Sequence, residues 1–218
     1  MIKFQAVIFD MDGVLVDSEP LHVSIETRMF GELNIPLTKD MYSRFAGTTS
    51  LSMWSSLVKE FHIDKKPEEL ASMSNNLFID ELKNSKDVKL FDGVVEVLNN
   101  LKSKNIPVAL ASSSSIDIVN AILNRFNIRD FFNVLVTGSD VKHSKPHPEI
   151  FLLAAKKLKI SPSDCIVVED STNGVLAAKH AGIYCVGFKP IGNRHELLEA
   201  SCKIKSFGEF NTKVLGVR

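Results

Sequence analysis

Two aspartates one residue apart, Asp10 and Asp12, end a short apolar run near the start of the chain, and Gly13 follows them. Like charges at the end of a buried strand repel each other, so the pair needs a chemical reason. Side chains two positions apart point to opposite sides of an extended strand. Both carboxylates can share one site only if the chain turns after Asp10, and Asp-Gly is a common turn dipeptide. The pattern therefore predicts a strand that ends in a turn carrying two carboxylates.

Other polar side chains that can do chemistry also follow apolar runs further along the chain. They are a hydroxyl, an ammonium and two more carboxylates, from Ser112, Lys145, Glu169 and Asp170. In parallel α/β sheets, ligands bind at the carboxyl ends of the strands. If the apolar runs are parallel strands, these groups meet Asp10 and Asp12 at one edge of a sheet.

Up to four carboxylates at one place need compensating positive charge, and Lys145 supplies only one. A hard divalent cation with oxygen ligands would supply two more, which favours Mg²⁺. Ser112, Lys145 and the backbone N–H groups near Gly13 suit the oxygens of a phosphate. One carboxylate can attack phosphorus to give an aspartyl-phosphate, and a second can serve the proton transfers. The set predicts a Mg²⁺-dependent phosphoryl-transfer site.

The elements that must position these groups alternate between strands and helices. Apolar runs without strict polar alternation predict strands covered on both faces, at 6–9, 108–111, 134–136, 165–168 and 184–188. The segments between them carry apolar residues at helical spacing, as in Val94, Val97, Leu98 and Leu101. Alternation of this kind predicts an α/β fold with a doubly wound, Rossmann-like parallel sheet.

The region from about 18 to 86 has a different pattern, helical throughout and without a good strand candidate. It is too long for an ordinary crossover connection, so we predict a second domain inserted into the first. The predicted division is a discontinuous core of 1–16 and 87–218 and an all-helical domain of 17–86, with linkers near 15–19 and 85–91. Helices are expected near 20–33, 38–46, 50–61 and 67–84.

Four motifs resemble, in their order, those of the haloacid dehalogenase (HAD) superfamily. They are FDMDGVLVDSE, ALASSS, SKPHPEIF and VVEDSTNGVLAAKHAG. The resemblance covers essentially the whole chain. It is similar to the subgroup with a small helical cap, which includes β-phosphoglucomutase and sugar-phosphate phosphatases. This implies a HAD core, with 17–86 as the cap and the stretch VLVDS as the exit from the core into it.

The resemblance also implies a role for each motif residue. Asp10 would be the nucleophile and a Mg²⁺ ligand, and Asp12 the general acid/base with its backbone carbonyl on the metal. Ser112 and Lys145 would hold the phosphoryl group. Asp170, with Glu169 close by, would complete the metal site. Dehalogenases of the superfamily lack the second aspartate, so dehalogenation is disfavoured here. The expected substrate-binding residues are Gly13, His22, Gly47, Thr48, Ser112, Ser113 and Lys145.

The choice between a phosphatase and a mutase depends on the cap. Mutase relatives have a histidine at the position of His22, but phosphatases of the subgroup carry one too. The mutase pattern has an arginine soon after the glycine that matches Gly47, where this chain has Thr48, and a lysine further along. Arg44 and Lys59 are alternative cations, although a solvated helix face explains them as well. Because a mutase must hold two phosphates, we favour hydrolysis of a small phosphomonoester such as a sugar phosphate, with β-phosphoglucomutase as the alternative.

Composition limits the partners and the location. The 26 basic and 26 acidic residues cancel, which disfavours binding of nucleic acid through a broad basic surface. No signal-like leader and no apolar stretch near ~18 residues is present, which disfavours a membrane protein. Three widely spaced cysteines without a C-x-x-C motif suit reduced thiols. We expect a cytoplasmic monomer whose partner is a small phosphorylated metabolite.

Overall fold

The computed structural model describes residues 4–36, 38, 41, 44–193 and 195–215. Its main element is a six-stranded sheet in the order β5-β4-β1-β6-β7-β8, in which every neighbouring pair is parallel. The strands are β1 (Ala6–Phe9), β4 (Val108–Ala111), β5 (Val134–Val136), β6 (Cys165–Glu169), β7 (Tyr184–Phe188) and β8 (Cys202–Ile204). Five of them match the predicted apolar runs, whereas β8 was not predicted.

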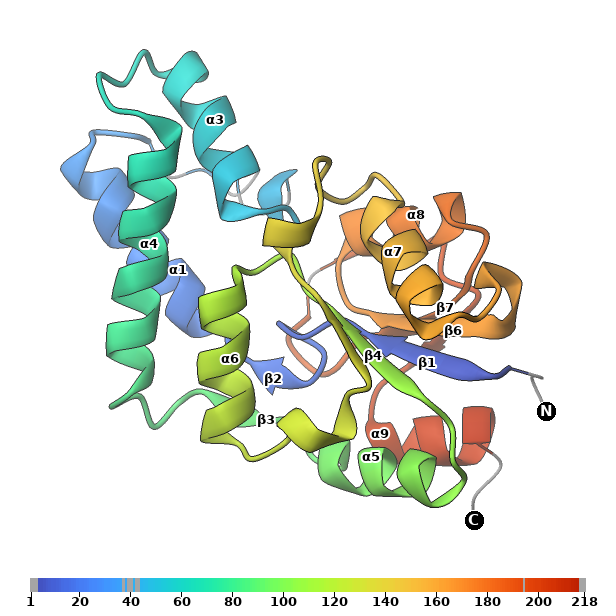
Figure 1. Ribbon diagram of the computed structural model, residues 1–218. Coiled ribbons are helices and arrows are strands. Elements are labelled where there is room, and N and C mark those ends of the chain that lie inside the picture. The colour runs from blue at the N-terminus through green and yellow to red at the C-terminus, as the bar shows by residue number, and fades with distance from the viewer. Residues whose placement is uncertain (1–3, 37, 39–40, 42–43, 194, 216–218) are drawn as a thin grey trace.

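Helices cover both faces of this sheet (Figure 1). Val7 and Phe9 of β1 pack into a cluster with helices α5 (Val94–Ser103), α6 (Ile116–Arg125) and α9 (Phe207–Phe210). Ala6 and Ile8 belong to a second cluster, with α7 (Glu149–Leu158) and α8 (Thr172–His180). Since alternate residues of a strand face opposite sides, both faces of β1 are buried, and the predicted doubly wound α/β fold is confirmed.

Three further helices lie together to one side of the sheet (Figure 1). We call them the helical block: α1 (Glu19–Glu32), α3 (Ser50–Glu60) and α4 (Pro67–Leu82), of which α4 packs against α6. Their apolar faces meet around Trp54, which is fully buried and packs edge-on against Phe30. The helices predicted at 20–33, 50–61 and 67–84 agree within about two residues. Of the one predicted at 38–46, Met41, Arg44 and Phe45 are helical, while 39–40 and 42–43 lie outside the described residues.

Two short strands join the helical block to the sheet-containing part. β2 (Val16–Asp17) pairs with β3 (Lys89–Leu90) in an antiparallel ribbon. These strands fall in the two linkers that the sequence predicts, but pairing between the linkers was not predicted. A strand of two residues is too short to show a periodic sequence pattern, and its partner lies more than 70 positions away in the sequence. The pairing therefore could not be predicted from local sequence. The domain boundaries themselves stay a prediction.

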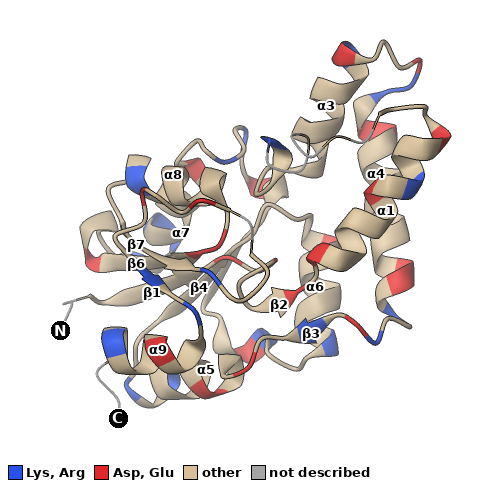
Figure 2. Cartoon of the chain, turned by 180° about the vertical axis from the view of Figure 1, so that it is seen from behind, with Lys and Arg blue, Asp and Glu red and all other residues tan. Residues whose placement is uncertain are grey.

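Short helical turns complete the chain, at Arg129–Phe131, Gly138–Asp140, Pro162–Asp164 and Asn211–Leu215. In the part of the chain that the structure describes, none of the helices combines the length and the apolar character needed to cross a bilayer. Basic and acidic positions are interspersed over both the helical block and the helices around the sheet (Figure 2). The charge is therefore mixed along the molecule, consistent with the formal net charge of zero.

Candidate active site

The chain turns directly after β1, where the sequence predicts a turn. The carbonyl of Met11 accepts hydrogen bonds from the N–H groups of Leu15, at 2.8 Å, and Val16, at 3.1 Å. Gly13 has a φ of +75°, and a Cβ atom there would lie 2.1 Å from Oδ2 of Asp170. Only glycine gives both this conformation and this close approach. The turn thereby brings the end of β1 against the end of β6.

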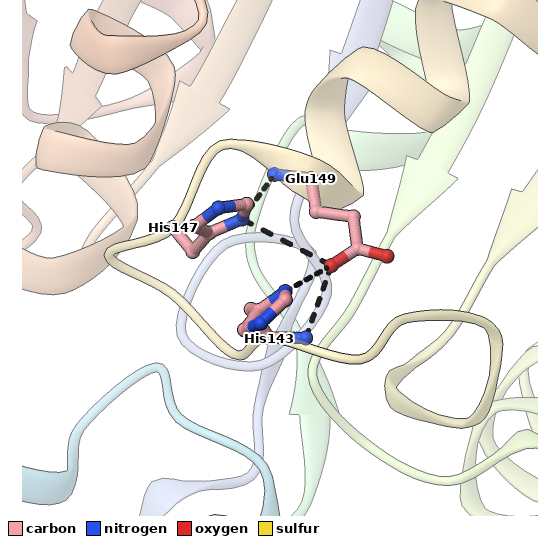
Figure 3. Close-up of side chains that lie close together, drawn as sticks. All are labelled: His143, His147 and Glu149. Carbon is pink, nitrogen blue, oxygen red and sulfur yellow. Dashed lines mark hydrogen bonds and ion pairs between the residues drawn. The ribbon is translucent and has the colours of Figure 1, made fainter.

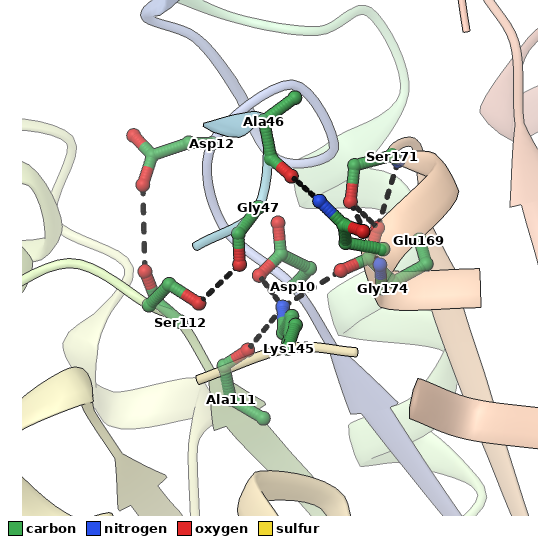
Figure 4. Close-up of polar contacts among 12 residues, drawn as sticks. Asp10, Asp12, Ala46, Gly47, Ala111, Ser112, Lys145, Glu169, Ser171 and Gly174 are labelled. Carbon is green, nitrogen blue, oxygen red and sulfur yellow. Dashed lines mark hydrogen bonds and ion pairs between the residues drawn. The ribbon is translucent and has the colours of Figure 1, made fainter. Parts of the chain in front are cut away.

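Lys145 links three strand ends, those of β1, β4 and β6, beside this turn (Figure 4). Its Nζ donates to Oδ1 of Asp10 at 2.6 Å, to Oε1 of Glu169 at 2.7 Å and to the carbonyl of Ala111 at 3.3 Å. The side chain is 1% exposed. Burial by itself lowers the pKa of Lys145, but the two carboxylates raise it above its usual range. The ammonium is therefore charged and held in one place.

Asp10, Glu169 and Asp170 form a buried acidic cluster whose carboxylate oxygens lie within 4.8 Å of one another. Burial raises the pKa of Asp10 to about 8, with Lys145 opposing and Glu169 adding to the rise. Burial and the charges of Glu169 and Asp10 also raise the pKa of Asp170. Three carboxylates beside one ammonium leave uncompensated negative charge. An oxygen-rich anionic site of this kind fits Mg²⁺.

Glu169 differs from the other two carboxylates in the number of its partners. Besides Lys145, it accepts hydrogen bonds from the backbone N–H of Ser171 at 2.9 Å and from its hydroxyl at 3.0 Å. Gly174 makes room for it, since a Cβ atom there would lie 1.8 Å from Oε1 of Glu169. Glu169 thus holds Lys145 and the start of α8 in place, in addition to lying in the acidic cluster.

Asp12 points away from the acidic cluster and has four side-chain neighbours. It accepts hydrogen bonds from the hydroxyls of Ser18 at 2.5 Å, Ser114 at 2.7 Å and Ser112 at 3.4 Å. Nε2 of His22 lies 3.4 Å from its Oδ1. Burial raises the pKa of Asp12, but the bonds from His22, Ser18 and Ser114 outweigh it and lower the pKa to about 2. Asp12 is therefore ionised in this arrangement.

His22 reaches Asp12 from the helical block. Its ring stacks on Phe78 of α4, with the centroids 4.3 Å apart. Burial lowers the pKa of His22, but the hydrogen bond and the charge of Asp12 raise it above the usual value overall. His22 therefore lies between α4 and Asp12, with 29% of its side chain exposed.

A second set of contacts holds the loop at 45–50 against the sheet-containing part. The hydroxyl of Ser113 donates to the carbonyl of Gly47 at 2.7 Å, and the amide of Asn173 donates to the carbonyl of Ala46 at 2.8 Å. Gly47 has a φ of +76°, and a Cβ atom there would lie 2.4 Å from Oγ of Ser171. Thr48 closes the turn through a 2.7 Å bond from its hydroxyl to the carbonyl of Phe45.

A cavity of about 180 Å³ lies between the turn after β1 and the helical block. Most predicted site residues line it: Asp10, Asp12, Gly13, His22, Gly47, Thr48, Ser113 and Asp170. Ser112, Lys145 and Glu169 do not line it and are buried beneath the lining. The remaining wall is largely apolar and includes Val23, Phe30, Met41, Phe45, Met53 and Phe78. A small molecule can thus reach Asp10 with one end and an apolar wall with the other.

The loop that carries Lys145 is fixed by Glu149 (Figure 3). Its carboxylate accepts hydrogen bonds from the backbone N–H groups of Lys142 at 3.2 Å and His143 at 3.0 Å. The side chains of His143 and His147 are 63% and 50% exposed and lie next to Glu149, away from the cavity lining. Both histidines are therefore loop residues outside the cavity lining.

Several residues of the site were not found by sequence reasoning. They are Ser18 and Ser114 beside Asp12, Ser171 and Gly174 beside Glu169, and Asn193, whose amide donates to Asp170 at 3.2 Å. Glycine is unfavourable within a helix, so its presence at Gly174, in the first turn of α8, is a sequence feature that could have indicated a close contact there. Asn193 follows β7 in an irregular segment, where no local pattern points to Asp170.

Comparisons with known proteins agree with this site. The sequence model of the haloacid dehalogenase-like hydrolases matches residues 7–188. A phosphorylated carbohydrates phosphatase of Thermotoga maritima is 37% identical over 183 residues, covering 82% of each chain. A β-phosphoglucomutase of Bacillus subtilis is 31% identical over 218 residues, covering 97% of this chain and 93% of the relative.

The fold is also found in a solved structure. The β-phosphoglucomutase of Clostridium difficile superimposes with a TM-score of 0.85 at 26% identity, over 98% of this chain and 96% of that one. The family match spans the strand ends that carry Asp10, Lys145 and Asp170. The chain therefore belongs to the haloacid dehalogenase-like hydrolase family, as an enzyme of the phosphatase type.

Proposed function

We propose that this enzyme hydrolyses small phosphomonoesters, in particular sugar phosphates, through an aspartyl-phosphate on Asp10. The observation that carries the proposal is the position of Asp10. It lines the cavity, is bonded to the buried ammonium of Lys145, and shares one tight turn with Asp12. A nucleophile and a proton carrier are thus presented to one bound phosphate.

The proposed reaction has two steps with separate roles for the two aspartates. Asp12 first takes up the proton of His22, whose Nε2 lies 3.4 Å from its Oδ1. A carboxylate oxygen of Asp10 then attacks phosphorus, and the bond to the leaving alkoxide breaks as Asp12 passes this proton to it. A water molecule then attacks the aspartyl-phosphate and gives a proton to Asp12, which releases phosphate and restores Asp10. Lys145 keeps the attacking carboxylate oriented, and Ser112 and Ser113 are proposed to bind phosphoryl oxygens from the end of β4.

The acidic cluster is the proposed Mg²⁺ site. Asp10, Asp170 and the backbone carbonyl of Asp12 would hold the ion, with Glu169 alongside. When bound, Mg²⁺ would neutralise the carboxylates and the charge on the phosphoryl oxygens. The raised pKa values of Asp10 and Asp170 support a cation here, because a positive charge keeps such buried carboxylates ionised.

Residues 17–86 are proposed to act as a cap that opens and closes on the β2–β3 ribbon. The bonds from Ser113 and Asn173 to the 45–50 loop join the cap to the core beside the cavity. Closure would exclude bulk water during attack, and opening would release the products. The contact between His22 and Asp12 would then report whether the cap is closed.

Hydrolysis is favoured over mutase chemistry by the charge of the cavity. Among the residues that the structure describes, no lysine or arginine lines it, whereas Glu19 and Glu26 do. Arg44 is paired with Glu60 outside the lining. A bisphosphate intermediate would need a cation for its far phosphate. Relatives with both kinds of name exist, and the phosphatase of Thermotoga maritima acts, by its name, on phosphorylated carbohydrates.

A phosphate-release screen over about a hundred phosphomonoesters with Mg²⁺ tests the proposal. We expect release from one or more sugar phosphates, loss of release with a chelator, and loss by at least about 10³-fold in Asp10→Asn. Asp92→Asn, at an exposed position, is the matched control. Full turnover in Asp10→Asn would refute the nucleophile. The protein would instead be a mutase if it converts β-glucose 1-phosphate only in the presence of a sugar bisphosphate and releases little phosphate.

A further inference from the structure

One carboxylate in the cavity, that of Glu26, lacks a hydrogen bond within the described part of the chain. Burial raises the pKa of Glu26, and the charge of His22 opposes this rise. Helix α1 presents Glu19, His22, Val23, Glu26 and Phe30 to the cavity, all on one helical face. His22 is held by Asp12, and Glu19 is exposed. Glu26 is partly buried and makes no hydrogen bond or ion pair with any other residue that the structure describes.

The cavity lining includes possible donors, such as Ser74 and Asn75, but within the described residues neither is hydrogen-bonded to Glu26. The wall around it is built largely from Phe30, Met41, Phe45, Met53 and Phe78. A carboxylate that loses water against such a wall is costly unless a donor replaces the lost hydrogen bonds. Within the described residues, the cavity lining holds no lysine or arginine, and His22, whose charge also acts on Glu26, lies against Asp12. The hydrogen bond that Glu26 lacks in this structure can therefore be supplied by the bound molecule.

The carboxylate of Glu26 also disfavours a bound molecule that carries a second anionic group. A phosphate or carboxylate on the far end of a leaving group would lie in the same small cavity as Glu26, with Glu19 also in the lining. Like charges within one small cavity repel each other strongly, because little water is present to screen them. A neutral hydroxyl meets no such barrier, and it donates the hydrogen bond that Glu26 lacks.

We propose that Glu26 determines specificity by accepting a hydrogen bond from a hydroxyl of the leaving group and by excluding leaving groups that carry a second anion. The substrate class is then a monophosphate of a neutral, hydroxylated carbon chain. This inference rests on the phosphatase function proposed above. It goes further by assigning the choice of leaving group to one side chain of α1.

Three esters of equal chain length test the inference: a hexitol monophosphate, hexyl phosphate and a hexitol bisphosphate. They differ only in hydroxyls and in the second phosphate. For the wild type we expect the highest kcat/KM with the hexitol monophosphate. Glu26→Leu should lower kcat/KM for that ester by about 10- to 100-fold and leave hexyl phosphate unchanged or improved. Glu26→Gln keeps a hydrogen-bond acceptor without the charge, so it should raise kcat/KM for the bisphosphate by about tenfold relative to the monophosphate.

Glu32→Gln, an exposed position on the same helix, is the matched control and should change none of the ratios. The inference is overturned if both Glu26 variants keep the wild-type ratios among the three esters, or if the wild type prefers the bisphosphate. The Gln variant is nearly isosteric, so it decides the question even if the Leu variant does not fold. Absence of phosphate release from every ester by the wild type would instead refute the proposed function.

Discussion

Replacing Lys145 with methionine should destabilise the protein strongly and in a pH-dependent way. The ammonium is 1% exposed and bonds Asp10 at 2.6 Å and Glu169 at 2.7 Å. Removing one partner of a buried ion pair costs about 3–5 kcal/mol, because the remaining charge is buried without compensation. Here two carboxylates lose their partner at once, so we expect a loss at the upper end of that range at about pH 7.5.

The sign of the pH dependence follows from the direction of the pKa shift. The pKa of Asp10 is raised in the folded protein, to about 8. The folded state therefore binds a proton more tightly than the unfolded state does, and stability falls as pH rises from about 4 to 8. Without Lys145 the pKa of Asp10 rises further. The wild type therefore stops losing stability above about pH 8, whereas the variant continues to lose it, so the deficit of the variant should be larger at about pH 9 than at about pH 7.5.

Urea denaturation at both pH values, in the presence of chelator, measures these differences. Lys157→Met is the matched control, since Lys157 forms a partly exposed ion pair with Asp140 at 3.3 Å. Such a pair contributes at most about 1 kcal/mol. The reasoning is wrong if Lys145→Met unfolds within about 1 kcal/mol of the wild type at about pH 7.5, or if its deficit is the same at both pH values.

Three further outcomes are expected. Gly174→Ala should lower the free energy of unfolding, measured by urea denaturation, by about 1–3 kcal/mol, because the added Cβ displaces Glu169. Gly31→Ala is the control and should not destabilise, since nothing lies within 4 Å of its added Cβ. Equal effects of the two substitutions would contradict this packing. The imidazole of His22 should titrate by NMR above its usual pKa, and at a lower pKa in Asp12→Asn, where only the charges of Glu26 and Glu19 still oppose the effect of burial. The raised pKa of His22 stabilises the folded protein fully at pH values below the pKa of the unfolded state. This stabilisation is lost as the pH rises through the pKa of the folded state. Mg²⁺ at 100 times its Kd should raise the free energy of unfolding by about 2.7 kcal/mol, and an unchanged Tm on chelation would speak against the metal site.

Much of the catalytic part of this protein is predictable from its sequence. Apolar runs that are buried on both faces predict parallel strands, and parallel strands place their carboxyl ends at one edge. Asp10, Ser112 and Glu169 each come directly after such a run, so local pattern and topology are enough to bring them together. The turn at Gly13 is equally local, because it depends on the conformation of one glycine.

Other features were decided only by the tertiary structure. The division of labour among the carboxylates depends on Lys145, which reaches Glu169 across 24 residues and Asp10 across 135. The sequence placed His22 in the cap but could not show that its ring meets Asp12. Likewise, the helical pattern of α1 does not reveal that Glu26 faces a cavity. Sequence periodicity fixes which side of an element is apolar, whereas the neighbours of a polar side chain depend on how distant elements pack.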